Sequence, residues 1–221
     1  GTDAAVLVIS ATDGVETSTE KMSALAVKLD IPRAIFINKL DRERANYVST
    51  LAEIKSVLEI EPILLQLPIG KEDGFKGIVD LISQKAFVYS DESGQPTETE
   101  IPADLEADVE LALEAMIEAV AMADDELVER YLEEGTLTFD EIRMGLNKGI
   151  LNGSVVPVLL GSASKNIGVD RLLWLSRAFP SGLSRGPVLT HKPGKPEETS
   201  ELRPDPNGSL VALCFKSIID P

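Results

Sequence analysis

The amino-acid sequence predicts an α/β fold with a parallel, doubly wound sheet. Short apolar runs typical of buried strands alternate along the chain with segments whose apolar residues recur at helical spacing. The connections between most of these segments are short, as in repeated strand–helix–strand units. Polar motifs directly follow two of the apolar runs, and open α/β sheets bind their ligands at the carboxyl ends of their strands. The sequence therefore predicts both the fold class and the edge of the sheet where a site should lie.

The first part of the chain predicts two strand–helix pairs. Residues 4–10 are an apolar run that ends at an Asp-Gly turn, and a helix is expected over 19–29. Pro32 separates this helix from a second apolar run at 33–37, and another helix is expected over 45–58. Apolar residues at helical spacing should face the core: Met22, Leu25, Ala26 and Leu29 in the first helix, and Val48, Leu51, Ile54 and Leu58 in the second.

A long insertion, residues 60–152, follows these units and far exceeds the ~4–6 residues of a typical loop. Its first part predicts short strands and its second part predicts helices, so we expect an inserted α+β subdomain. The last helix opens with Thr138 and Glu141, whose spacing is that of a capping box. Strands are expected at 62–67, 76–81 and 86–89, and helices at 103–121, from Asp124, and from Thr138 to about Gly153.

The rest of the chain should complete the parallel sheet and then leave it. A strand at 155–160 and a helix at 169–179 close the sheet, and Trp174 is assigned to the core. A stretch dense in Pro, Gly and charge then predicts an extended linker, and alternating apolar residues predict a strand. The chain is thus divided into a main α/β domain (1–59 and 153–180), the inserted subdomain (60–152), a linker (181–205) and the start of a β-barrel second domain (206–221).

Composition limits the classes of function. The formal net charge of −16 argues against a groove that binds nucleic acid directly, because phosphate contacts need clusters of Lys and Arg. His191 and Cys214 are the only residues of their types and form no nucleophile–base pair, and no cluster shows metal-ligand spacing. We therefore predict no catalytic and no metal-binding residue. Apolar runs stay short of ~18 residues and no signal-peptide pattern is seen, so a cytoplasmic protein without membrane contact is expected.

The most informative motif is Asn38-Lys39-Leu40-Asp41, which directly follows the run at 33–37. The Asp41 carboxylate can accept both hydrogens of the guanine N1/N2 edge, a bidentate contact that adenine cannot reproduce. The Lys39 stem can lie over the base, and Asn38 can tie neighbouring loops together. Failure to pair should reject the wrong base by ~1–3 kcal/mol. The alternative is a loop in which Asp41 caps the next helix and Lys39 is solvated.

A second motif, Ser162-Ala163, follows the predicted strand at 155–160. A small residue at this point lets a backbone N–H approach the guanine O6 closely. The pair is a weak signal alone, but it gains force because the carboxyl ends of parallel strands meet at one edge of the sheet. Asn38, Lys39, Asp41, Ser162 and Ala163 are therefore the predicted nucleotide-binding residues.

Over nearly its whole length the chain resembles elongation factor G, the translational GTPase that drives ribosomal translocation. The matching stretches are Ile37-Asn38-Lys39-Leu40-Asp41-Arg42, Gln66-Leu67-Pro68-Ile69-Gly70, Phe75-Lys76-Gly77-Ile78-Val79-Asp80-Leu81, Gly161-Ser162-Ala163, Lys165-Asn166 and Gly168-Val169. The resemblance implies a GTPase-type sheet and identifies 1–59 and 153–180 as the C-terminal part of a GTP-binding domain. The chain departs from the family at Ser164, where a bulkier apolar residue is usual. Residues 42–47 look closer to the elongation-factor-G-like paralogue branch than to the main translocase.

Segments that such a GTPase uses for phosphate and magnesium do not occur in these 221 residues. There is no Gly-x-x-x-x-Gly-Lys-Ser/Thr loop, and no Asp-x-x-Gly switch segment precedes the first strand. The sequence opens on Gly1 and enters a strand almost at once. We therefore expect a fragment that is inactive alone, while the full-length protein would hold Mg²⁺ and hydrolyse GTP.

The resemblance also implies ligands and partners: GTP or GDP in the pocket, and the ribosome for the full-length protein. In elongation factor G the corresponding insertion contacts the stalk protein of the large ribosomal subunit. An acidic helix face would suit a partner with lysines, mainly by speeding encounter, and a solvated outer face is the alternative. The acids are Glu106, Asp108, Glu110, Glu114 and Glu118.

Two other functions stay open at this point. One is a protein-docking module whose nucleotide pocket is vestigial, and the other is a ribosomal protection GTPase of the tetracycline-resistance type. The long insertion with Gln66-Leu67-Pro68-Ile69-Gly70 argues against the protection GTPase. Guanosine binding that is lost in Asp41→Asn would argue against a vestigial pocket.

Overall fold

The computed structural model describes residues 2–91, 93–179, 187–192, 194–208, 210–212, 214, 216 and 217. Residues 4–179 form one compact unit, and the described residues beyond 179 belong, with residues 2 and 3, to a second unit. In the described part of the chain, no helix combines the length and apolar character needed to cross a membrane.

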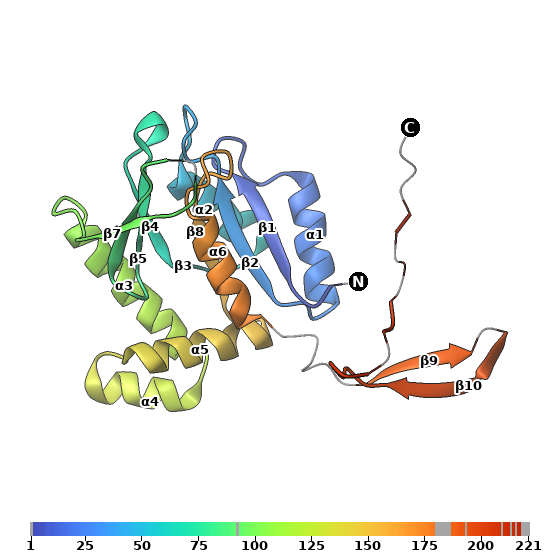
Figure 1. The fold of residues 1–221 in the computed structure, drawn as a ribbon. Helices are drawn as coiled ribbons and strands as arrows, with labels where there is room; N and C mark the ends of the chain where they lie inside the picture. The colour runs from blue at the N-terminus through green and yellow to red at the C-terminus, as the bar shows by residue number, and fades with distance from the viewer. Residues whose placement is uncertain are drawn as a thin grey trace. The chain divides into compact units, whose positions relative to one another are not determined.

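The larger unit is built on a four-stranded parallel sheet (Figure 1). Its strands are β1 (Ala5–Ser10), β2 (Arg33–Asn38), β8 (Val156–Leu160) and β3 (Pro62–Leu64), in the spatial order β1-β2-β8-β3. Each neighbouring pair is parallel. The predicted α/β class with a parallel sheet is therefore confirmed.

Alternate residues of β2 show how the sheet is buried on both faces. Ala34 and Phe36 belong to one hydrophobic cluster, together with Met116 and Ile150 from the inserted helices. Ile35 and Ile37 belong to a second cluster, which contains Ile54 of α2 (Tyr47–Leu58). A strand buried on both faces reads as a continuous apolar run, which is why β2 and β8 could be recognised from sequence.

The helix faces of the main fold follow the prediction only in part. Asn46 caps α2 by accepting from the backbone N–H groups of Val48 and Ser49. Helix α1 (Thr17–Lys28) instead buries Ser23 and Ala26, whereas three residues of its predicted core face, Met22, Leu25 and Leu29, are exposed. The Ser23 hydroxyl accepts from the Arg33 guanidinium of β2 at 3.1 Å, so the small residues of α1 face the sheet and the larger ones point away from the described core.

The predicted burial of Trp174 is also wrong. Helix α6 (Val169–Leu175) and the short 3-10 helix η2 (Ser176–Ala178) occupy the expected place. Leu175 is buried, but Trp174 is 38% exposed. Four successive large apolar residues point in different directions around a helix, so a single contact face cannot bury them all.

The inserted subdomain begins with a second sheet, which is antiparallel. It comprises β4 (Gln66–Ile69), β5 (Gly77–Asp80), β6 (Lys85–Val88) and β7 (Thr97–Thr99), in sequential order, with the short helix η1 (Glu72–Gly74) between β4 and β5. The single strand predicted at 62–67 is in fact two. β3 pairs with β8 in the parallel sheet, and after Leu65 the chain enters the antiparallel sheet as β4.

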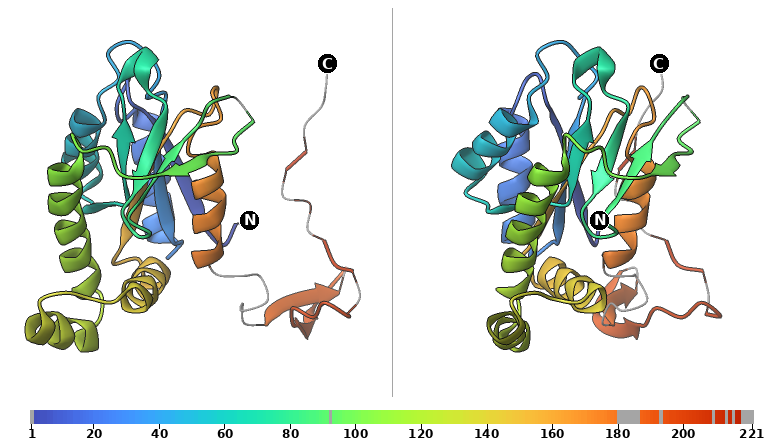
Figure 2. Two further views of the ribbon diagram at one scale, coloured as in Figure 1. Left: turned by 60° about the vertical axis from the view of Figure 1, so that its left-hand side comes forward. Right: turned by 90° about the vertical axis from the view of Figure 1, so that its left-hand side faces the viewer.

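Three helices complete the insertion: α3 (Glu106–Ala121), α4 (Asp125–Glu134) and α5 (Phe139–Asn152). Asp124 caps α4, and the predicted capping box of Thr138 and Glu141 opens α5. Figure 2 shows α3 running beside the inserted sheet, with α4 and α5 at the far end of α3. The predicted insertion of strands followed by helices is therefore present.

The smaller unit contains an antiparallel hairpin of β9 (Val188–Lys192) and β10 (Lys195–Leu202). This differs from the extended linker predicted over 181–205, because the two segments pair as antiparallel strands, with the Thr190 hydroxyl bonded to Ser200 across the ladder. Residues 181–186 of that linker lie outside the described residues. Among residues 206–221, those that the structure describes form no strand, so the start of a β-barrel domain stays a prediction.

Candidate functional site

The loops after β1, β2 and β8 emerge at one edge of the parallel sheet, drawn uppermost in Figure 1. Backbone hydrogen bonds join them at their bases. The N–H of Ala11 donates to the Asn38 carbonyl at 2.8 Å, and the N–H of Gly161 donates to the Ile37 carbonyl at 3.0 Å. Leu40 in turn donates to the Gly161 carbonyl at 3.3 Å. The predicted motifs are thus held together at the carboxyl ends of adjacent strands.

Asn38 joins the two predicted motifs directly. Its side-chain Oδ1 accepts a hydrogen bond from the backbone N–H of Ala163 at 2.9 Å. Asn38 is the last residue of β2, and Ala163 lies three residues beyond the end of β8. This contact agrees with the bracing role that the sequence predicts for Asn38.

Asp41 carries a buried carboxylate with an unused oxygen. Its exposed fraction is 6%, and its Oδ1 has no hydrogen-bond partner among the described residues. The other oxygen, Oδ2, lies 3.8 Å from Nε of Arg42. The alternative role as a helix cap is wrong, because Asn46 caps α2. A buried acceptor without a donor costs ~1–3 kcal/mol, so the arrangement favours a donor from outside the chain.

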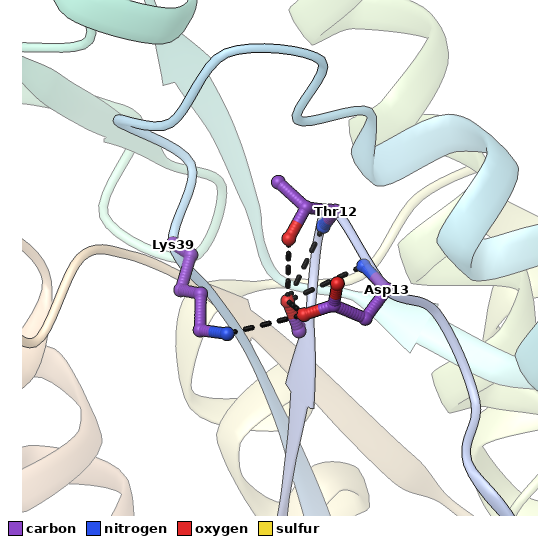
Figure 3. A network of polar contacts seen from close by, with 4 residues as sticks. Thr12, Asp13 and Lys39 are labelled. Atoms are coloured by element: carbon purple, nitrogen blue, oxygen red, sulfur yellow. Dashed lines mark hydrogen bonds and ion pairs between the residues drawn. The ribbon is translucent and has the colours of Figure 1, made fainter.

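Lys39 lies in a polar network with residues that the sequence analysis missed (Figure 3). Its Nζ is 3.1 Å from Oδ2 of Asp13, which also accepts from the Ser10 hydroxyl at 2.6 Å. The hydrogen bond from Ser10 and then that from Lys39 lower the pKa of Asp13. Lys39 has a φ of 66°, so its backbone turns sharply after β2. Asp13 follows β1 at the same sheet edge, and that position could have identified it.

Ser162 and Ala163 have a different role here from the predicted one. Ser162 is fully buried, and its N–H and carbonyl both bond to Ile167 across the loop, at 3.0 and 2.9 Å. Because the Ala163 N–H is taken by Asn38, both predicted donors are used inside the chain. The neighbouring Ser164 is exposed, and its N–H makes no hydrogen bond within the described residues. It is the free donor that the sequence analysis overlooked.

A hollow of about 590 Å³ lies between the three loops. This volume is within the range of ~300–1,000 Å³ that small-molecule sites occupy. No group of His, Cys, Asp and Glu in the described part of the chain is arranged to hold a metal ion. The residues that line the hollow are Thr12, Asp13, Asn38, Lys39, Arg42, Glu43 and Ser164.

Comparisons with known proteins agree with this geometry. The family model described as the elongation factor Tu GTP binding domain matches residues 1–181. A crystal structure of a protein from Thermus thermophilus is similar, with a TM-score of 0.75 and 30% sequence identity over 85% of this chain. The match covers 28% of the Thermus thermophilus chain, so the present sequence spans less than a third of that protein.

Proposed function

The chain belongs to the family of the elongation factor Tu GTP-binding domain, as part of the GTP-binding domain of a translational GTPase, and on this premise we propose that its hollow recognises guanine. One observation carries the proposal. Asp41 keeps a buried oxygen without a donor among the described residues, and it stands in the chain between Lys39 and Arg42, which line the hollow although Asp41 itself does not. The guanine N1–H and N2–H supply the donors that this carboxylate lacks.

Each predicted residue has a defined part in this proposal. Asp41 accepts from the base edge, the Lys39 stem lies along the ring while its Nζ is held by Asp13, and Asn38 braces the loop that carries Ala163. The buried Ser162 shapes that loop. The backbone N–H of Ser164 then takes the place of the predicted donors and donates to the guanine O6. The Ala163 N–H could donate to O6 only if its hydrogen bond to Asn38 were broken.

The full-length protein, we propose, binds GTP and GDP and acts on the ribosome in the cytoplasm, where hydrolysis drives translocation. Mg²⁺ bound with the nucleotide neutralises the developing phosphate charge in such reactions. The contribution of this chain's own residues is to bind and orient the base. Ribosome-stimulated GTP hydrolysis by the full-length protein tests the wider role, and its absence would favour a docking module.

We expect the isolated chain to bind guanosine weakly but selectively. Base contacts without phosphate contacts should give a Kd near millimolar, about −4 kcal/mol. Amide shifts followed by NMR during titration with guanosine and GDP should centre on 38–41 and 162–164, and ADP should produce none. Shifts spread over the chain, or equal shifts with ADP, would contradict guanine recognition. No shift up to tens of millimolar would favour the vestigial pocket.

The inserted helix α3 is proposed to dock the ribosomal stalk protein. Glu110, Glu114 and Glu118 follow at helical spacing and are exposed, and no basic residue occurs in the last turn of the helix. Such a face raises the association rate with a lysine-bearing partner by electrostatic steering. We propose the stalk protein as that partner, because the chain resembles elongation factor G, whose corresponding insertion contacts it.

Charge-neutral variants test this docking. Replacing Glu110, Glu114 and Glu118 together with Gln should slow association with purified stalk protein about tenfold at low salt. The matched control replaces three exposed acids of α4, Glu129, Glu133 and Glu134, and changes the net charge equally. Association rates measured by stopped flow at two salt concentrations distinguish the α3 variant from the α4 control. Equal slowing in both variants would show that only the net charge of the chain matters and would contradict docking through α3.

A further inference from the structure

The inserted subdomain touches the loop 161–168 at its beginning. Gln66, the first residue of β4, is 1% exposed, and its Oε1 accepts from the N–H of Leu160 at 2.9 Å. Leu160 immediately precedes the loop that carries Ser162 and Ala163. The inserted sheet therefore fixes the point where the loop leaves β8.

A stronger contact lies just after the loop. The hydroxyl of Tyr89, which follows β6 and is buried, donates to Oδ1 of Asp170 at 2.5 Å. Arg171 bonds to the other Asp170 oxygen at 2.8 Å, and its guanidinium lies 4.3 Å from the centre of the Phe87 ring. Burial and then the Asp170 hydrogen bond raise the pKa of Tyr89, so the phenol stays a donor at neutral pH.

The middle of the loop also meets the insertion. Gly94 has a φ of +74°, and a Cβ at this position would lie 2.3 Å from Nδ2 of Asn166. Asn166 itself has a φ of 54° and stands one residue before the buried Ile167. The backbone of the insertion at Gly94 is therefore a third point of contact with the loop, after those at Gln66 and Tyr89.

We propose that Tyr89 is a positioning residue for guanine binding, because its hydroxyl fixes the first turn of α6 and with it the loop 161–168. The inference rests on the proposed recognition of guanine by this loop. If the bond between Tyr89 and Asp170 only stabilised the fold, its loss would leave the loop unchanged in the folded protein. We expect the loop to change, because Asp170 lies only two residues after it and the insertion also contacts the loop region at Gln66 and Gly94.

The test compares Tyr89→Phe with Tyr131→Phe in the full 221-residue chain. Tyr131 is a partly buried tyrosine that packs in the helical part of the insertion. Loss of one net hydrogen bond should accelerate amide exchange of 161–168 in the free protein about three- to tenfold and weaken guanosine binding by a similar factor. Tyr131→Phe should change neither. Unchanged exchange and affinity in folded Tyr89→Phe would overturn the inference.

The two readouts separate this inference from the proposed function. If the unmodified chain does not bind guanosine, guanine recognition fails even where exchange shows that Tyr89 orders the loop. If guanosine binds equally to both variants, recognition stands and positioning by Tyr89 is rejected. Should Tyr89→Phe not fold, Asp170→Asn weakens the same bond from its less buried partner and should accelerate loop exchange in the same direction.

Discussion

Asp41→Asn is expected to exchange guanosine for xanthosine as the preferred nucleoside. The amide keeps one acceptor for the base N1–H but replaces the second acceptor with an NH₂ donor. Guanine presents its own NH₂ at that place, so two donors would face each other, whereas the 2-oxo group of xanthine accepts. A discrimination of ~1–3 kcal/mol for a bidentate base contact corresponds to a loss of guanosine affinity of about 5- to 150-fold.

The measurement is a pair of NMR titrations, guanosine and xanthosine, on the unmodified chain and on Asp41→Asn. Glu43→Gln is the matched control, because Glu43 is only two residues from Asp41 and the substitution removes the same charge from an exposed side chain at the rim of the hollow. It should leave the preference for guanosine unchanged. If Asp41→Asn retained guanosine affinity, the carboxylate would not read the base edge.

Asp41→Asn should also leave the fold intact. Oδ1 of Asp41 has no partner among the described residues, and Oδ2 has only the distant Arg42. Removing a buried charge that lacks a donor therefore takes away little that stabilises the folded chain. An unchanged urea midpoint would show that lost guanosine binding comes from the base contact and not from unfolding.

How far the sequence predicts this protein depends on the range of the interactions involved. The parallel sheet could be predicted, because β2 and β8 are buried on both faces and read as apolar runs. The positions of Asn38, Lys39 and Asp41 followed from the motif at the end of β2. The Asp13 partner of Lys39 lies outside that motif, and its position after β1 identifies it only once β1 and β2 are placed as neighbours in the parallel sheet.

The errors share a physical cause: pairing and packing partners that lie far along the chain decided the outcome. Pro62 and Gln66 lie in one apolar stretch, but its first part pairs with β8 and its second part pairs with β5. The Ser162 and Ala163 amides were predicted as free donors, yet Ile167 and Asn38 accept from them. Hydrogen bonds of a tight loop leave no periodic signal in the sequence.

Gly161→Ala is expected to destabilise the larger unit by about 2–3 kcal/mol, because the new methyl group would be forced into a filled space. A Cβ on Gly161 would lie 2.4 Å from the Ile167 carbonyl oxygen and 2.5 Å from Cζ of Phe36. The first of these is backbone, so it cannot rotate away as a long side chain could. Moving it would disturb the bonds between Ile167 and Ser162.

Gly74→Ala provides the matched control, since nothing lies within 4 Å of a Cβ at that position. Urea unfolding followed by fluorescence of Trp174, the single tryptophan, should show a clearly lower midpoint for Gly161→Ala and almost none of that loss for Gly74→Ala. Guanosine binding by the folded variant should fall as well, because Gly161 bonds to both Ile37 and Leu40 at the base of the hollow. Equal urea midpoints for the two variants would mean that the loop moves to accommodate the new methyl group without loss of stability. Its shape could then not hold Ser162 and Ser164 where a guanine base requires them.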